Sequence, residues 1–325
     1  MSRLRFFDLH CDTLTELYYG NRSFLENDLH ISLKKIEKYE RYAQVFAIFT
    51  HSSLSDEDGY LAFLKVSDFF RQLTEQYSDW ILPSENYVDL SLAWENGKAA
   101  AFLAVEDARI LAGRIERLRE IYERGVRFLT LLWAGETCIG GSWNTSVGLT
   151  DFGKETVREC FRLGIVPDVS HASLASTDDI VSIAKEYKRP IVATHSDSYS
   201  VYPHGRNLSD EHFESIRCLG GLVGINLYKH HLSDGQADPA DAETVFRHID
   251  HYLSIGGEDT VCFGCDFDGA ELPESFRDMS SVALLADVML RHNYSERIVH
   301  KIFSENAEAF MRRTFPTPKQ NTNLT

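Results

Sequence analysis

Eight short apolar runs alternate along the chain with longer stretches of helical periodicity. Several runs are apolar throughout, as expected of parallel strands that are buried on both faces of a sheet. Strand–helix alternation repeated eight times predicts a (β/α)8 barrel, a TIM-like α/β fold. The predicted strands lie near residues 5–10, 43–49, 100–106, 126–132, 165–170, 191–195, 221–227 and 260–266.

The stretches between these strands have the pattern of amphipathic helices. Ser173 and Ser209 are well placed to cap two of them. No Pro/Gly/Ser-rich linker divides the sequence, so we expect one barrel domain over residues 1–313. Residues 314–325 are polar, contain two prolines and predict a loosely held tail. The predicted helices cover 57–77, 114–124, 152–163, 174–187, 210–219, 240–255, 281–292 and 295–312.

Composition narrows the class of protein. The chain has 325 residues and a formal net charge of −16, which disfavours binding to nucleic acid. No run approaches 18 apolar residues, and no signal-peptide pattern follows Met1, so we expect a cytoplasmic protein without a membrane association. The six cysteines are scattered, which predicts small buried side chains and no disulfide framework. Cys262 and Cys265 should point to opposite faces of one strand.

The most informative polar residues lie where the predicted strands end. In a (β/α)8 barrel the carboxyl ends of the strands converge on the active site. Residue types that bind metals end five of the eight strands, and imidazole and carboxylate groups together suit Zn²⁺ and related cations. These residues are His10 and Asp12, Glu106, His171, His195, and Asp266 with Asp268.

Each of these signals is weak alone. An HxD such as His10–Asp12 puts both side chains on one face of a strand, but such pairs also arise by chance. The alternatives are an ion pair between Glu106 and Arg109, and ordinary core positions for His171 and His195. Their joint occurrence at convergent strand ends favours a metal site over these alternatives.

Five segments, spanning His10 to Gly269, resemble the sequence blocks of the membrane (renal) dipeptidase family of zinc peptidases, in its microbial type. The segments are HCDTL, VED, VSHAS, THSDSYSVYPHGRNLSD and FGCDFDG. The resemblance implies two divalent ions, expected to be Zn²⁺, and suggests a homodimer. It further implies that His10 and Asp12 bind one ion, that His171 and His195 bind the other, and that Glu106 bridges them.

The resemblance also implies a set of residues around the substrate. Arg206 would contact the substrate carboxylate, Asp266 would lie beside the attacking water and the substrate amino group, and Tyr228 would lie near the substrate. The chain departs from the family after the fourth predicted strand, where many members read LTLTH and this chain reads LTLLW. The indole of Trp133 can donate one hydrogen bond but cannot act as a base, so Trp133 should change substrate choice or form a pocket wall.

These features together predict a metal-dependent dipeptidase. Two ions that share a carboxylate can hold a water between them and lower its pKa towards about 7, which gives a bridging hydroxide. Asp266 would move the proton, with Asp268 as the rival candidate unless it hydrogen-bonds the loop backbone. Arg206 would clasp a free C-terminal carboxylate through two parallel hydrogen bonds.

Two other functions fit the same residues less well. One is a related metal-dependent amidohydrolase or lactonase, with Trp133 marking the changed pocket. The other is a non-catalytic barrel that keeps metal only for its structure. Asp266 and Arg206 argue against the second, since neither is needed to hold a metal.

Overall fold

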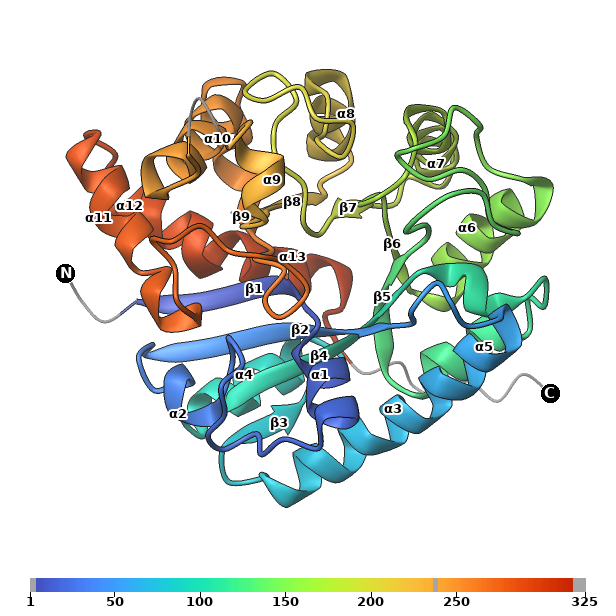
Figure 1. Cartoon of the computed structure of the whole chain (residues 1–325), viewed down its shortest axis with the longest axis horizontal. Coiled ribbons are helices and arrows are strands. Elements are labelled where there is room, and N and C mark those ends of the chain that lie inside the picture. Colours follow the sequence, from blue (N-terminus) through green and yellow to red (C-terminus); the bar gives the residue numbers. More distant parts are fainter. Residues whose placement is uncertain (1–3, 236–238, 318–325) are drawn as a thin grey trace.

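Eight parallel strands close into a barrel in the computed structural model, which describes residues 4–235 and 239–317 (Figure 1). Pairing between β2 and β4 closes the ring, from Ala43 opposite Ala100 to Phe49 opposite Glu106. All eight predicted strands are present. The ring runs β1 (Arg5–Cys11), β2 (Arg41–Phe49), β4 (Ala99–Glu106), β5 (Val126–Thr130), β6 (Val166–Asp168), β7 (Val192–Ala193), β8 (Leu222–Ile225) and β9 (Val261–Phe263), with β9 again beside β1.

A ninth strand, β3 (Ile81–Pro83), pairs with the beginning of β4 and was not predicted. It is three residues long and ends in a proline, so it lacks the length and the alternation on which the prediction of a strand depends.

Helices surround the barrel on its outer side (Figure 1). Ser173 and Ser209 cap their helices as predicted, accepting hydrogen bonds from the backbone N–H groups of Ser176 and His212. The α-helices are α1 (Thr13–Gly20), α2 (Leu33–Ile36), α3 (Asp56–Gln76), α4 (Tyr87–Glu95), α5 (Arg117–Glu123), α6 (Asp151–Leu163), α7 (Leu174–Tyr187), α8 (Asp210–Cys218), α9 (Lys229–Leu232), α10 (Ala242–Ser254), α11 (Leu284–Arg291), α12 (Glu296–His300) and α13 (Asn306–Thr314).

The last predicted helix, 295–312, is divided. A π-helical turn, Lys301–Glu305, separates α12 from α13. Three short 3₁₀ helices cover Ala108–Leu111, Gly257–Asp259 and Met279–Ser281. Four helices that are nine residues or shorter were not predicted: α1, α2, α4 and α9.

The core has two layers. One apolar cluster fills the barrel with residues from every strand of the ring, among them Phe7, Phe102 and Phe128, and it extends to α4 and α13. The second cluster packs between the strands and the outer helices. Since apolar side chains fill the barrel interior, the polar residues at the carboxyl ends of the strands line the remaining, open end.

The boundary of the predicted tail shifts in the structure. Thr314 ends α13, and Phe315 is buried with its ring centroid 5.8 Å from that of Phe128. Residues 314 and 315 are therefore part of the barrel domain, and residues 318–325 of the predicted tail lie outside the described residues.

The cysteines are unpaired, as predicted. Cys262 belongs to the cluster inside the barrel and Cys265 to the outer cluster, so the two thiols do lie on opposite faces. Cys218, at the end of α8, is exposed and Cys138 is half-buried, so the prediction of buried side chains is correct for four of the six. Among the described residues, no helix combines the length and the apolar character that crossing a membrane requires.

Candidate metal centre and active site

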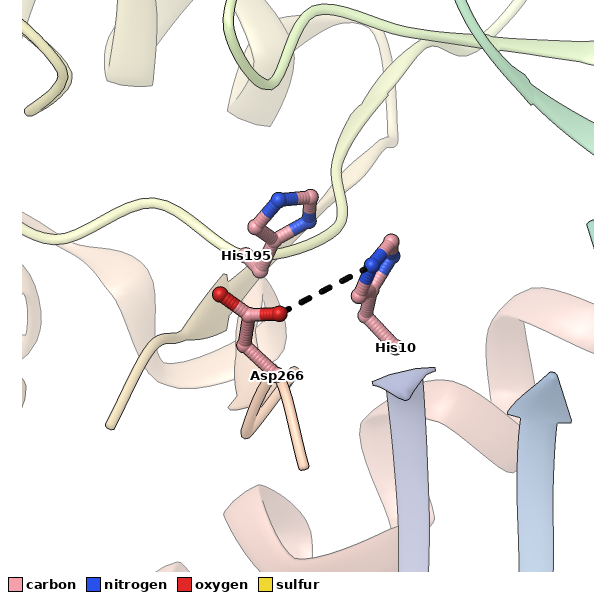
Figure 2. Close-up of side chains that lie close together, drawn as sticks. All are labelled: His10, His195 and Asp266. Carbon is pink, nitrogen blue, oxygen red and sulfur yellow. Dashed lines mark ion pairs between the residues drawn. The ribbon is translucent and has the colours of Figure 1, made fainter. Parts of the chain in front are cut away.

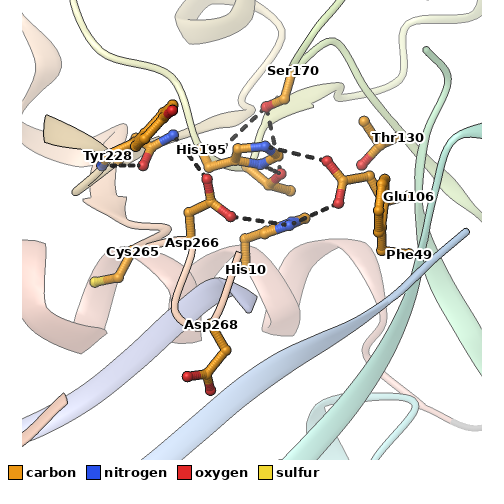
Figure 3. Close-up of polar contacts among 12 residues, drawn as sticks. His10, Phe49, Glu106, Thr130, Ser170, His195, Tyr228, Cys265, Asp266 and Asp268 are labelled. Carbon is orange, nitrogen blue, oxygen red and sulfur yellow. Dashed lines mark hydrogen bonds and ion pairs between the residues drawn. The ribbon is translucent and has the colours of Figure 1, made fainter. Parts of the chain in front are cut away.

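The structure brings His10, Asp12, Glu106, His171 and His195 together at the carboxyl ends of the strands. Glu106, the last residue of β4, directs one carboxylate oxygen towards His10 and the other towards His195 (Figure 3). Its Oε2 is 3.4 Å from His10 Nε2, and its Oε1 is 3.1 Å from His171 Nε2 and 3.7 Å from His195 Nε2. One carboxylate therefore faces imidazoles on both sides.

These groups form two clusters that share Glu106. One contains His10, Asp12 and Glu106, and the other contains Glu106, His171 and His195; within each, the potential ligand atoms lie within 4.8 Å of one another. Asp266 forms a further cluster with His10 and His195, and its Oδ1 is 4.0 Å from His10 Nε2 (Figure 2). Below we call the first cluster the His10 side and the second the His171 side.

The donor atoms fit divalent cations. His10 Nε2 and Asp12 Oδ1 are buried, yet neither has a hydrogen-bond partner. Buried polar atoms are normally paired, because an unpaired one loses its hydration without compensation. Nitrogen and oxygen donors in this combination suit Zn²⁺ and similar ions. The residues present therefore fit bound divalent metal.

Several strand ends have an unusual backbone. His171, Asp266, Asp268 and Asp107 have φ values of 67°, 59°, 68° and 81°. Side-chain-bearing residues seldom adopt this left-handed region, and where they do, the surrounding structure must hold them. The carbonyl of His171 accepts a hydrogen bond from the backbone N–H of Trp143 at 2.8 Å, which braces one of these positions.

Carboxylates dominate the electrostatics of the His10 side. Burial alone would lower the pKa of His10, but the negative charges of Glu106, Asp12 and Asp266 raise it to about 10. Burial, followed by the charge of Glu106, raises the pKa of Asp12 well above its usual range. This side therefore gathers negative charge that requires a proton or a cation.

The His171 side has the opposite character. Burial and then the charge of Arg206 lower the pKa of His171 to about 4. Burial, with the charges of His10 and Arg206, also holds the pKa of His195 well below its usual value. Both imidazoles are therefore neutral at neutral pH, which is the form that binds metals.

Arg206 lies beside this centre and is only 4% exposed. Its guanidinium donates to Ser196 Oγ and to the carbonyl of His195, both at 3.0 Å. Its Nε is buried without a partner, and burial lowers its pKa. A buried, partly unpaired guanidinium suits an anionic ligand such as a carboxylate.

Asp266 and Asp268 have distinct environments (Figure 3). Asp266 faces His10, and burial raises its pKa. Asp268 instead accepts hydrogen bonds from Thr13 Oγ1 at 2.5 Å and from the backbone N–H of His30 at 2.6 Å. Asp268 thus ties the loop to its neighbours, which is the alternative role considered for it, and Asp266 is the carboxylate that faces the centre.

Tyr228 and Trp133 line the surroundings of the centre, and both are half-buried. The backbone N–H of Tyr228 donates to Asn226 Oδ1 at 2.7 Å, and Asn226 in turn donates to Asp266 Oδ2 at 3.4 Å. The Trp133 ring lies 5.0 Å from that of Phe49 and 6.3 Å from that of His171, measured between centroids. Trp133 therefore forms an aromatic wall with Phe49.

The residues behind the candidate ligands were not predicted from the sequence. Asn226, directly after β8, donates a hydrogen bond to Asp266. Thr194 forms hydrogen bonds with both Asp168 and His195, so it links these two residues. The available signal was an aspartate in the apolar run IVPDVS and a threonine directly before a candidate ligand. A buried aspartate in a strand requires hydrogen-bond partners, and these can only be identified in three dimensions.

Comparison with known proteins agrees with this geometry. A family model described as membrane dipeptidase, peptidase family M19, matches residues 1–322. The crystal structure of a metallopeptidase described as dipeptidase AC is 27% identical, with a TM-score of 0.89 over 97% of this chain and 100% of that one. A Rhodobacter sphaeroides metallopeptidase, solved with a phosphinate mimic of the dipeptide L-Ala-D-Ala, is 26% identical, with a TM-score of 0.89 over 96% and 100%.

A more distant structure shares the fold. The probable dipeptidase PvdM from Pseudomonas aeruginosa is 18% identical, with a TM-score of 0.85 over 97% of this chain and 96% of that one. The (β/α)8 barrel predicted from strand–helix alternation is thus the barrel of these proteins. With a family match along nearly its whole length, the chain belongs to the membrane dipeptidase family, and it is a metal-dependent dipeptidase.

Proposed function

We propose that this protein hydrolyses dipeptides that have a free C-terminal carboxylate, using two Zn²⁺ ions held on the two sides of Glu106. The observation that carries the proposal is the position of Glu106, whose two oxygens face His10 on one side and His171 and His195 on the other. A shared carboxylate of this kind suits a pair of ions rather than one. His10 and Asp12 would hold one ion, and His171 and His195 the other.

The bound ions would supply Lewis acidity, which polarises a carbonyl and lowers the pKa of a water molecule towards about 7. Asp266 would accept the proton of the attacking water and deliver it to the leaving amine. Its carboxylate lies 4.0 Å from His10 and is oriented by Asn226, so it faces the centre without any rearrangement.

Arg206 would select the substrate by its C-terminus. The guanidinium is buried and keeps one donor, Nε, without a partner. A free carboxylate satisfies such a donor, whereas an internal peptide bond brings no charge to it. The mimic of L-Ala-D-Ala bound by the Rhodobacter sphaeroides relative has the size of substrate that this arrangement favours.

The wall of Trp133 and Phe49 would limit what fits beside His171. Trp133 cannot supply a cation or a base, so activation must come from the metal centre and from Asp266. Tyr228 would contact the part of the substrate that lies near Asp266, because Asn226 hydrogen-bonds both Tyr228 and Asp266.

A combined metal and substrate measurement tests the proposal. We expect elemental analysis to give about two divalent ions per chain, and we expect a dipeptide panel to be hydrolysed faster than lactones or other small amides. Amidating the substrate C-terminus should raise KM strongly in the wild type and much less in Arg206→Lys, because an ammonium cannot reproduce the fork. Protein that takes up no Zn²⁺, or that prefers lactones, would refute the proposal.

A further inference from the structure

We infer that Asp168 is a positioning residue for His195, and that it acts through the hydroxyl of Thr194 to keep the Nε2 lone pair of His195 directed at the metal centre. This inference rests on the proposed function, since it assigns a role to residues behind a proposed ligand. It concerns which ring nitrogen of His195 bears the proton.

Asp168, the last residue of β6, is fully buried and receives four hydrogen bonds. Its Oδ1 accepts from the backbone N–H groups of Ser170 and Thr194, both at 2.9 Å. Its Oδ2 accepts from Thr130 Oγ1 at 2.6 Å and from Thr194 Oγ1 at 2.5 Å. A carboxylate can only accept, so all four partners must donate to it.

The hydroxyl proton of Thr194 is therefore committed to Asp168. Thr194 Oγ1 also lies 2.8 Å from His195 Nδ1. A hydroxyl has one proton and two lone pairs, so towards His195 it can only accept. His195 must then bear its proton on Nδ1, which leaves the Nε2 lone pair free. That Nε2 lies 3.7 Å from Glu106 Oε1 and 2.9 Å from His171 Nε2, at the centre.

His171 has no such support. Its Nδ1 is buried without a hydrogen-bond partner. Its Nε2 lies 3.1 Å from Glu106 Oε1, so without a metal it can bear the proton on Nε2 and donate to that oxygen. The two histidines of one cluster thus differ, because His195 is preset for binding and His171 is not. Partners behind a ligating histidine commonly fix its tautomer in this way.

Asp168→Asn should reverse the direction of hydrogen-bond donation from residue 168 through Thr194 to His195. The asparagine oxygen would keep the two backbone donors, and its NH₂ group would then face Thr194 and donate to it. Thr194 would turn its own proton towards His195 Nδ1, which moves the histidine proton to Nε2 and blocks the lone pair. A comparable aspartate-to-asparagine exchange in serine proteases produces the wrong histidine tautomer.

Two substitutions of Thr194 change the hydrogen bonds of Asp168 less than Asp168→Asn does. Thr194→Val removes the hydroxyl with little change of shape, and Thr194→Ser restores it. Thr130→Val is the matched control, because it also removes a hydroxyl that donates to Asp168 but does not contact His195. The readout is Zn²⁺ affinity of the His171 side, measured by competition with a chelator. We expect Thr194→Val to weaken it about 10- to 100-fold, and Thr194→Ser and Thr130→Val to stay near wild type.

The tautomer itself can be read from ¹⁵N chemical shifts of histidine in the metal-free protein, with His195 assigned from the signals lost in His195→Gln. We expect the Nδ1–H form in wild type and Thr130→Val, and the Nε2–H form in Asp168→Asn. Equal Zn²⁺ affinities of Thr194→Val and Thr130→Val, or an Nε2–H form in the wild type, would overturn the inference. Wild-type protein that fails to bind Zn²⁺ would instead refute the proposed function, while the tautomer measurement would still test the relay.

Discussion

The two sides of Glu106 use the same kinds of donor atom in opposite electrostatic settings. On the His10 side, one imidazole is surrounded by Asp12, Glu106 and Asp266, and its pKa is raised to about 10. On the His171 side, burial and the charge of Arg206 lower the pKa of His171 to about 4. Without metal, His10 on the first side therefore keeps a proton at neutral pH, whereas His171 and His195 on the second side are neutral. The His10 side is the more negative of the two because it has Asp12 where the other side has a second imidazole, and because Asp266 lies beside it.

The difference also assigns the two sides different tasks. The side rich in carboxylates adjoins Asp266, the group proposed to move protons. The neutral side adjoins Arg206, whose guanidinium donates to the carbonyl of His195. We interpret the first as the side where Asp266 transfers the proton and the second as the side where Arg206 binds the substrate carboxylate.

The largest effect should come from the residue that both sides share. Glu106→Gln keeps the shape but replaces one ligand oxygen with an NH₂ group and removes the negative charge. We expect elemental analysis to show loss of both ions and dipeptide hydrolysis to fall to background. His171→Ala is the comparison, because it should empty mainly one site. If Glu106→Gln still held two ions, Glu106 would not be the link between the two sides.

Next in size is the loss of the proposed general base. Asp266→Asn preserves shape but cannot accept a proton, so kcat should fall on the order of 10²- to 10⁴-fold. Metal content should stay near two ions, which distinguishes this variant from a lost ligand. Asp268→Asn is the control, since Asp268 binds Thr13 and His30 and should affect loop stability more than turnover. Inactive Asp268→Asn beside active, metal-replete Asp266→Asn would exchange the two roles.

Only part of this contrast between the two sides could be predicted from the sequence. The strands and the clustering of the five candidate ligands could be predicted, because apolar runs mark the strands and ligand-type residues stand at their ends. The opposite electrostatics could not, since they depend on how closely Glu106, Asp12 and Asp266 surround His10 and on Arg206 lying beside His171. The roles of Thr194 and Asp168 were also out of reach, because strand threonines are common and only hydrogen-bond geometry singles one out.

Substitution of Gly269 should have a smaller effect on Zn²⁺ affinity, confined to the His10 side. A methyl group there would lie 1.9 Å from Asp12 Oδ2 and 2.6 Å from Asp266 Oδ1, so Gly269→Ala must displace these carboxylates. We expect Zn²⁺ affinity of the His10 side to fall about 10- to 100-fold, as for other residues behind a ligand, with the His171 side unchanged. Gly205→Ala is the control, because the atoms nearest to its methyl group belong to Trp143 and lie at an ordinary contact distance of 3.5 Å or more. Equal weakening of both sides would show that they are not independent.

The smallest change, about tenfold in Zn²⁺ affinity for a single pH unit, tests the electrostatic contrast directly. A proton on His10 competes with the ion, and because the pKa of His10 is raised to about 10, that proton is present throughout the neutral range. Affinity of the His10 side should therefore fall about tenfold for each unit of pH lowered between 8 and 6. His171, with its pKa lowered to about 4, is already neutral above about pH 5, so the His171 side should change little.

Zn²⁺ titrations of two variants measure the two pH dependences. His171→Ala keeps the His10 side, and His10→Ala keeps the His171 side. Calorimetry in buffers of different ionisation enthalpy should show release of at least one proton for the first variant. Equal slopes in the two variants would mean that the charges around His10 do not control metal uptake.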